Sequence, residues 1–184
     1  WADIDPQGAL NFANHLSNKK DRRTAISVII SDWTANDATA AAAWAKQLRA
    51  GPFRNEVLHD VITGMAGVDP QAALALYRSS GAEPATFEYP FQLLSPIFGA
   101  WAEKDPIEAA QAAAQLPLGD RRIAREIIAS SWAGIDPQAA MAWARTIPNS
   151  DEKNLAIQNI LSQWSRTDPA GAAEWIRQMP EGSA

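Results

Sequence analysis

The sequence contains no cysteine, only two histidines and no long apolar run. The absence of cysteine excludes disulfides, thiol catalysis and cysteine-ligated metal, but it leaves the compartment open, because many proteins of oxidising compartments also lack cysteine. The apolar stretches are shorter than the roughly 18 to 20 residues that a transmembrane helix needs, so we expect no membrane insertion. Phosphate-binding-loop, nucleophile-elbow and zinc-protease motifs are absent. We therefore expect neither an enzyme nor a bound cofactor or metal.

Basic residues are in the minority. Sixteen Lys and Arg against twenty-one Asp and Glu give a net charge of −5, which argues against nucleic acid as a partner. The two histidines, His15 and His59, are far apart in the sequence. Neither is followed by an Asp or Glu three or four residues later, the spacing at which two metal ligands could share one face of a helix. A basic run at residues 19–23 is interpreted as a solvated turn, with anion binding as the alternative. With 47% apolar residues, the 184-residue chain can form a core without disulfides or metal.

What the sequence does contain is one repeated motif. In residues 132–148, WAGIDPQAAMAWARTIP, a Trp precedes an Asp-Pro step that opens an Ala-rich helix containing a second Trp. The first slot of the motif recurs at steps of 32, 32, 36, 31 and 32 residues and holds Trp1, Trp33, Met65, Trp101, Trp132 and Trp164. Self-similarity at this period is typical of stacked helical hairpins. The sequence therefore predicts an all-α fold.

Each repeat is expected to contain a helix A followed by a helix B. Asp at the fifth position suits a helix N-cap, and Pro follows it in all repeats but the second, where Ala38 stands instead. The Asp residues are Asp5, Asp37, Asp69, Asp105, Asp136 and Asp168. Helix A is predicted to run about 12 residues, with an invariant Ala at the ninth position facing a close neighbouring backbone. Helix B is predicted to be capped by Asp21, Asp120 and Ser150 in three of the repeats.

The third repeat departs from the pattern. Its step is four residues longer than 32, and residues 81–90, GAEPATFEYP, widen the turn between its helices. Pro96 falls inside its helix B, where it should remove a backbone hydrogen bond and kink the helix. Tyr77, Phe87 and Tyr89 gather in this region. The array is expected either to bend here or to bind something.

These motifs resemble the tetratricopeptide-type alpha-solenoids, and more closely the tandem W-A-x-x-D-P-x-x-A-x-x-W repeats of large, mostly uncharacterised bacterial proteins. The resemblance covers residues 1–184 and rests on Trp101-Ala102 with Asp105-Pro106, Trp132-Ala133 with Asp136-Pro137, and Trp164 with Asp168-Pro169. It implies a protein-binding scaffold with no catalytic residues to carry over. The Leu-Gly pair of the standard tetratricopeptide unit is missing.

We expect one right-handed alpha-alpha superhelix (solenoid) over residues 1–184, with about five and a half helical hairpins of roughly 32 residues each. The chain begins at Trp1 without a signal-peptide pattern, so we interpret it as a fragment of a longer array. The last helix A lacks its helix B, and its apolar face should seek another chain. The eight tryptophans all fall in the first or twelfth position of a repeat and are predicted to pack in the core.

The fourteenth position forms a column that lies outside the predicted core face of helix A. It holds Asn14, Lys46, Arg78, Ala114, Arg145 and Arg177, so four of six members are basic. Cations suit the negative end of a helix dipole, but they could also line a groove that holds an acidic or C-terminal peptide. Small or amide side chains flank the column: Gln7, Asn11, Ala43, Gln71, Ala75, Gln111, Gln138 and Ala142.

The predicted function is a non-catalytic scaffold that binds a protein or peptide, an acidic one included, on the concave surface of the array. Its predicted contact residues are Lys46, Arg78, Gln111, Arg145, Arg177, Tyr77, Phe87 and Tyr89. Two alternatives stay open. One is a structural spacer or oligomerisation segment that forms a homo-oligomer through exposed terminal repeats. The other is a carbohydrate or cell-envelope binding module that uses exposed aromatic side chains around Tyr77.

Overall fold

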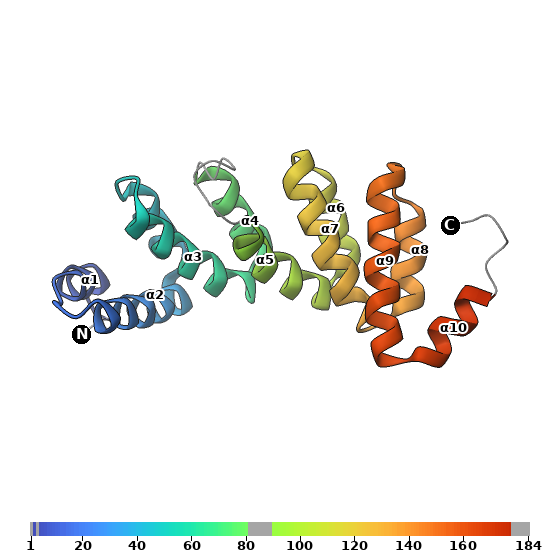
Figure 1. Cartoon of the computed structure of the whole chain (residues 1–184). Coiled ribbons are helices and arrows are strands. Elements are labelled where there is room, and N and C mark those ends of the chain that lie inside the picture. Colours follow the sequence, from blue (N-terminus) through green and yellow to red (C-terminus); the bar gives the residue numbers. More distant parts are fainter. Residues whose placement is uncertain (1, 3, 81–89, 178–184) are drawn as a thin grey trace. The chain divides into compact units, whose positions relative to one another are not determined.

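The structure is a computed structural model that describes residues 2, 4–80 and 90–177 (Figure 1). Over these residues it contains ten α-helices and no strand, which confirms the predicted all-α class. The chain forms two compact units, unit 1 over Trp1–Ile97 and unit 2 over Phe98–Ala184. The helix α5 (Pro90–Lys104) spans the border between the two units.

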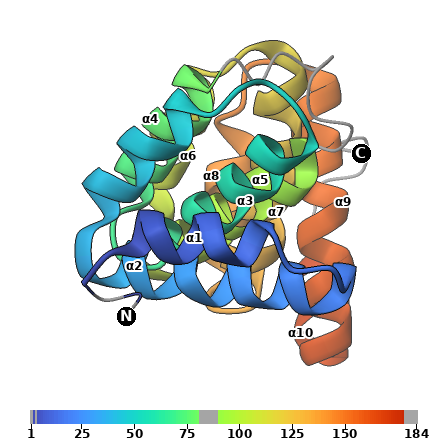
Figure 2. The ribbon, with the colours of Figure 1, turned by 90° about the vertical axis from the view of Figure 1, so that its left-hand side faces the viewer.

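Unit 1 is built from helices that pack on their neighbours in sequence. They are α1 (Pro6–Asn14), α2 (Lys19–Gln47), α3 (Pro52–Ala66) and α4 (Pro70–Ser79). The helix α1 packs on α2, α2 on α3, and α3 on α4. Figure 2 shows α1 lying along α2. The helix α2 combines the predicted helix B of the first repeat with helix A of the second. At their border, Asp37 has non-helical dihedrals, φ −150° and ψ 81°.

Unit 2 follows the same order of packing. Its helices are α6 (Pro106–Ala114), α7 (Leu118–Ala133), α8 (Pro137–Arg145), α9 (Ser150–Thr167) and α10 (Pro169–Arg177). The helices α6 and α8 both pack on α7, whereas α8 and α10 pack on α9. In addition, α7 packs on α9, so two successive helices B are in direct contact. Figure 1 shows α7, α8 and α9 side by side.

The predicted Asp caps are all present. In each of the six repeats, the Asp side chain accepts a hydrogen bond of 2.8–2.9 Å from the backbone N–H three residues ahead. Pro occupies the first helical turn after five of these caps. The helices A formed by α1, α4, α6 and α8 are nevertheless shorter than predicted, at 9 or 10 residues. They end early because backbone bonds of the tighter i to i+3 type close the last turn, as between Ile147 N–H and the Ala144 carbonyl (3.2 Å).

The predicted caps of helix B were wrong by one to three residues. Asn18 caps α2 by accepting a hydrogen bond from Lys20 N–H at 2.9 Å, whereas Asp21 lies in the first turn. Asn149 caps α9, and Ser150 is its first residue. Pro117 precedes α7 without a side-chain cap bond, and Asp120 lies in the first turn of that helix. An Asn carboxamide caps as well as a carboxylate, while acidic residues inside the first turn still favour the helix dipole.

Small residues set the distances between helices in the core. The ninth-position alanines are all buried: Ala9, Ala41, Ala73, Ala109, Ala140 and Ala172. Between α2 and α3 the contact is closer still, because a Cβ placed on Gly64 would lie only 2.9 Å from Cγ2 of the buried Thr34. The backbone of α3 can approach α2 this closely only because residue 64 lacks a side chain.

Tryptophan pairs recur inside the repeats. The rings of Trp33 and Trp44 lie 5.5 Å apart, those of Trp132 and Trp143 lie 5.7 Å apart, and those of Trp164 and Trp175 lie 6.3 Å apart. In each pair the first-slot Trp is buried, as predicted. The twelfth-position Trp is only half-buried, so the prediction that every tryptophan lies in the core was wrong for these three. They are therefore more exposed than their buried first-slot partners.

The fourth repeat replaces the pair with other contacts. Its twelfth position is Ala112, and the ring of Trp101 stacks instead on Phe98, with centroids 5.9 Å apart and planes 16° apart. The indole Nε1–H of Trp101 donates a hydrogen bond of 3.0 Å to Glu108 Oε2.

Pro96 lies inside α5, as the sequence predicted. The rest of the widened turn, residues 81–89, falls outside the described residues.

Candidate functional site

The fourteenth-position column is solvent-exposed at every one of its six members. The cations nevertheless differ in their surroundings. The guanidinium of Arg145 lies 5.1 Å from the ring centroid of Trp175, a cation–π contact between α8 and α10. Arg177 forms an ion pair with Glu174 in its own helix. In unit 1, Lys46 and Arg78 project from the last turns of their helices, where a cation also favours the helix dipole.

A hollow of about 460 Å³ lies beside this column in unit 1. We call it the unit-1 hollow. Residues from α1, from the end of α2, from the α2–α3 connection and from the start of α3 line it: Leu10, Asn11, Asn14, Trp44, Leu48, Arg49, Ala50, Gly51, Pro52 and Phe53. Its walls therefore combine two carboxamides, one cation, one indole and several apolar side chains. Asn11 and Asn14 come from the predicted groove, and the half-buried face of Trp44 borders the same space.

Sequence reasoning missed the turn that closes this hollow. Gly51 has φ +157°, at the edge of the region that favours glycine, and Pro52 begins α3 directly after it. Arg49, which lies two residues before Gly51, lines the hollow. The Gly-Pro step is visible in the sequence as a turn signal, but only the fold shows that the turn faces helix α1.

The predicted aromatic site in the third repeat does not form as expected. The prediction of an exposed Tyr77 was wrong, because its side chain is 3% exposed and belongs to the core of unit 1. It occupies the thirteenth position of helix A, which faces the core in the first five repeats. Phe87 and Tyr89 lie outside the described residues. Gln111 is exposed on α6.

A buried ion triad, which the sequence did not reveal, joins α7 to α9. Glu152 is 5% exposed. Arg121 holds it with two hydrogen bonds, from Nε to Oε2 at 3.3 Å and from Nη2 to Oε1 at 3.1 Å. Arg125 donates a further bond from Nη1 to Oε2. We call these three residues the Arg–Glu triad. Charges of opposite sign at nearly equivalent positions of two successive helices B were the only signal in the sequence.

The electrostatics of the triad favour the charged carboxylate. The hydrogen bond from Arg121 is the largest cause that holds the pKa of Glu152 below its usual value of 4.5. Burial works in the opposite direction, and the positive charges of Arg125 and Arg121 add to the lowering. Glu152 is therefore an anion held by two cations at neutral pH.

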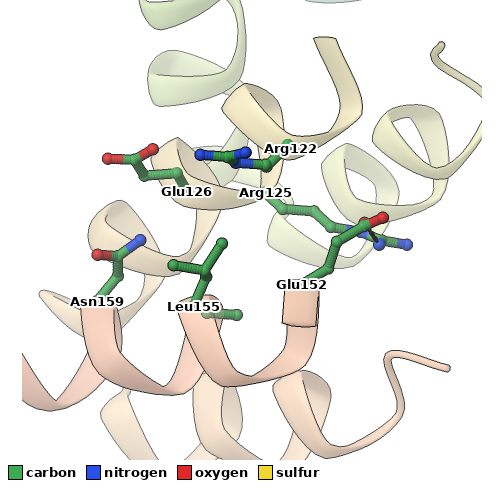
Figure 3. A pocket seen from close by; sticks show the side chains of 7 residues that line it. Arg122, Arg125, Glu126, Glu152, Leu155 and Asn159 are labelled. Atoms are coloured by element: carbon green, nitrogen blue, oxygen red, sulfur yellow. Dashed lines mark hydrogen bonds and ion pairs between the residues drawn. The ribbon is translucent and has the colours of Figure 1, made fainter. Parts of the chain in front are cut away.

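A second hollow, of about 260 Å³, lies against this triad. We call it the α7–α9 hollow. Figure 3 shows Arg122 and Glu126 extending from α7, and Leu155 and Asn159 extending from α9. Arg125, Glu152 and Ala156 complete its lining. Arg122 and Glu126 are exposed, whereas Asn159 is half-buried.

The two histidines each contact a residue close to them in the sequence. His15 Nδ1 lies 2.6 Å from the carbonyl oxygen of Asn11, and His59 Nδ1 lies 3.2 Å from Asp60 Oδ1. Over the described ranges, no three His, Asp or Glu side chains come together as metal ligands. The interpretation of the basic run at residues 19–23 as a turn was wrong, because these residues form the start of α2 after the Asn18 cap. Within the run, Arg23 pairs with Glu56 at 3.0 Å.

Across the part of the chain that the structure describes, no helix is both long enough and apolar enough to cross a membrane. Comparison with protein-family models gives no match for the chain, and neither the curated proteins nor the solved structures provide one.

Proposed function

We propose that this protein is a non-catalytic scaffold that binds an extended segment of a protein partner on its helices A. The observation that carries the proposal is the unit-1 hollow, in which Trp44, Arg49, Asn11 and Asn14 meet beside the exposed column. Such a mixture of apolar walls with a few polar groups is typical of recognition sites.

The proposed architecture is the tetratricopeptide-like solenoid of about five and a half hairpins. Support comes from the packing of helices in sequence order within each unit and from the identical Asp caps of the repeats. Repeats that contact mainly their neighbours produce extended surfaces suited to peptides. In such a stack, the column at the fourteenth position runs along one side of successive helices A.

The chemistry of the hollow favours a peptide with acidic side chains. The guanidinium of Arg49 can bind a carboxylate, and the carboxamides of Asn11 and Asn14 can each donate to and accept from a peptide backbone. The half-buried indole of Trp44 offers a flat apolar surface to a neighbouring side chain. Lys46 and Arg78 add positive charge beyond the hollow itself.

The proposal is tested with peptides selected from a random library displayed on phage. Selected peptides are then synthesised with a dye and titrated by fluorescence anisotropy against the wild type and against Arg49→Glu and Lys46→Glu. We expect enrichment of acidic peptides and at least a tenfold weaker binding to Arg49→Glu, because reversal replaces an attraction with a repulsion. Circular dichroism should show an unchanged fold, since both side chains are exposed.

Arg166→Glu provides the matched control, because Arg166 is an exposed cation near the end of α9 and its Nε donates only to the Ser162 carbonyl among the described contacts. If Arg166→Glu and Arg49→Glu weaken peptide binding equally, the weakening comes from the change in net charge and not from a specific contact of Arg49. Reversal at Arg78 tests whether the peptide reaches α4. Reversal at Arg145 is less direct, because it also removes the cation–π contact with Trp175.

Self-association is a second candidate function, supported by α10. Ile176 on this helix is 53% exposed, and the neighbouring Trp175 is only half-buried. An exposed apolar face of this kind can bury itself against another chain. Sedimentation equilibrium of the wild type and of Ile176→Asp tests this function. A monomer at all concentrations in both proteins would reject it.

A further inference from the structure

Two pairs of successive repeats differ in what covers the twelfth-position Trp. In repeats five and six, Arg145 at the fourteenth position of α8 lies over the ring of Trp175 at the twelfth position of α10, 5.1 Å from its centroid. In repeats one and two, the same positions hold Asn14 and Trp44, and both residues line the unit-1 hollow. By repeat position, the unit-1 hollow therefore corresponds to the space that a long guanidinium side chain fills in unit 2.

The charges around Trp44 disfavour a second cation in this space. Lys46 and Arg49 are both exposed, and neither has an ion-pair partner among the described residues. By contrast, Arg177, which matches Lys46 by repeat position, is paired with Glu174. The described lining of the hollow contains no carboxylate. An incoming Lys or Arg side chain would therefore meet uncompensated positive charge, whereas a neutral ring would not.

The remaining wall of the hollow is suited to an aromatic ring. Leu10, Leu48 and Phe53 line it together with Trp44. Its volume of about 460 Å³ lies within the roughly 300–1,000 Å³ of sites that enclose drug-sized ligands, so it has room for a large side chain. An aromatic ring gains free energy from apolar burial and from the ring contact with an indole.

We propose that the partner segment inserts an aromatic side chain into the unit-1 hollow, where its ring contacts Trp44. This inference rests on the proposed function and names the anchor of the bound segment, next to the acidic residue that Arg49 attracts. Asn14 determines the specificity of the site, because a longer side chain at its position would cover Trp44 as Arg145 covers Trp175.

The experiment is a titration of the ¹⁵N-labelled protein with three blocked dipeptides, followed by NMR. The probe is N-acetyl-aspartyl-phenylalanine amide. One control replaces the phenylalanine with alanine, and the other replaces the aspartate with lysine. The readout is the indole Nε1–H signal of Trp44, identified as the signal that is missing in Trp44→Phe.

We expect the aspartyl-phenylalanine probe to shift this signal in a saturable way. The alanine control should bind about five- to tenfold more weakly, because one aromatic pair alone contributes about a factor of five and apolar burial adds to it. The lysyl control should also bind more weakly, because it brings a cation toward Arg49. Equal dissociation constants for the phenylalanine and alanine dipeptides, or tighter binding of the lysyl dipeptide, would overturn the proposal.

Asn14→Arg provides a test of opposite sign. The added positive charge alone would favour an acidic probe, yet this variant should bind the aspartyl-phenylalanine dipeptide at least tenfold more weakly, because the new guanidinium covers Trp44. Gln7→Arg is the matched control, since it adds the same charge to an exposed position of α1 outside the described lining. It should bind as tightly as the wild type or slightly more tightly. Tighter binding by Asn14→Arg would contradict the proposal.

Peptides selected on phage separate this inference from the proposed function. Selected peptides that bind the unit-1 hollow equally well after their aromatic residues are replaced by alanine would overturn the inference and leave the proposed function standing. Conversely, saturable shifts of Trp44 with the dipeptide, without enrichment of any peptide, would support the aromatic site and reject the proposed function.

Discussion

Replacing Glu152 with Gln should destabilise unit 2 strongly for so small a change in shape. The side chain keeps its size, but two guanidiniums lose the anion that neutralises them. Breaking a buried ion pair by removing one partner typically costs about 3–5 kcal/mol. The lower end applies here, because the side chains of Arg121 and Arg125 are 27% and 13% exposed and water can reach them in part. We therefore expect a loss of about 3 kcal/mol, or about 6–12 °C in melting temperature for a chain of this length.

Hydrogen exchange measured by mass spectrometry is the most informative assay for this variant. The amides of α7 and α9 should exchange faster in Glu152→Gln, whereas those of α1 and α2 in unit 1 should be unaffected. Glu126→Gln is the matched control, because it removes an exposed carboxylate from the same hollow and should change stability by less than about 0.5 kcal/mol. Equal stability of the two variants would refute the assignment of Glu152 as a buried anion that unit 2 requires.

The triad also predicts a pH dependence. The pKa of Glu152 is lowered in the folded protein, chiefly by its hydrogen bond from Arg121. Its contribution to stability is therefore fully present above the unfolded value of about 4.5 and is lost as the pH falls toward the lower folded value. The difference in unfolding free energy between wild type and Glu152→Gln should accordingly shrink below about pH 4.5. A difference that stays constant between pH 7 and pH 3 would contradict this linkage.

Two further predictions concern packing. Gly64→Ala should lower the urea midpoint of unfolding despite the better helix propensity of Ala, because the new Cβ would lie 2.9 Å from Thr34 Cγ2. Gly99→Ala should raise the free energy of unfolding by up to about 1 kcal/mol, because nothing lies within 4 Å of its new Cβ. Opposite signs in the two midpoints are the expected result, and a stabilising Gly64→Ala would show that α2 and α3 are not in close contact. Trp132→Ala should cost about 3–5 kcal/mol, and Trp143→Ala clearly less, because only the first ring is buried. Equal losses in thermal unfolding would contradict this difference.

The periodic part of the fold could be predicted from sequence, because its causes are local. An Asp that accepts a hydrogen bond three residues ahead and a Pro in the first turn act within one helical turn, so Asp136 and Pro137 identify a helix start without knowledge of the rest. The ninth-position Ala and the first-slot Trp were likewise predicted as buried, because they recur at one position of every helix. The caps of helix B were less predictable, since several Asn, Asp and Ser residues compete within a few positions.

The candidate sites could be predicted only in part, because they depend on contacts between repeats. The exposed column was visible as a recurrent position, yet the contact of Arg145 with Trp175 requires the relative placement of α8 and α10. The Arg–Glu triad joins residues 31 positions apart, and nothing in either helix alone distinguishes Glu152 from a solvated carboxylate. Tyr77 illustrates the opposite error. It was interpreted as exposed because other aromatic residues follow it closely in the sequence, although its position on helix A faces the core.

The central claim is that a partner segment binds to the helices A of unit 1. The most direct measurement is the NMR shift map of the ¹⁵N-labelled protein with a peptide selected from the random library. The account predicts that the side-chain signals of Asn11, Asn14, Trp44 and Arg49 shift together and saturate at one dissociation constant. Shifts confined to residues outside this hollow, with those four signals unchanged, would contradict it.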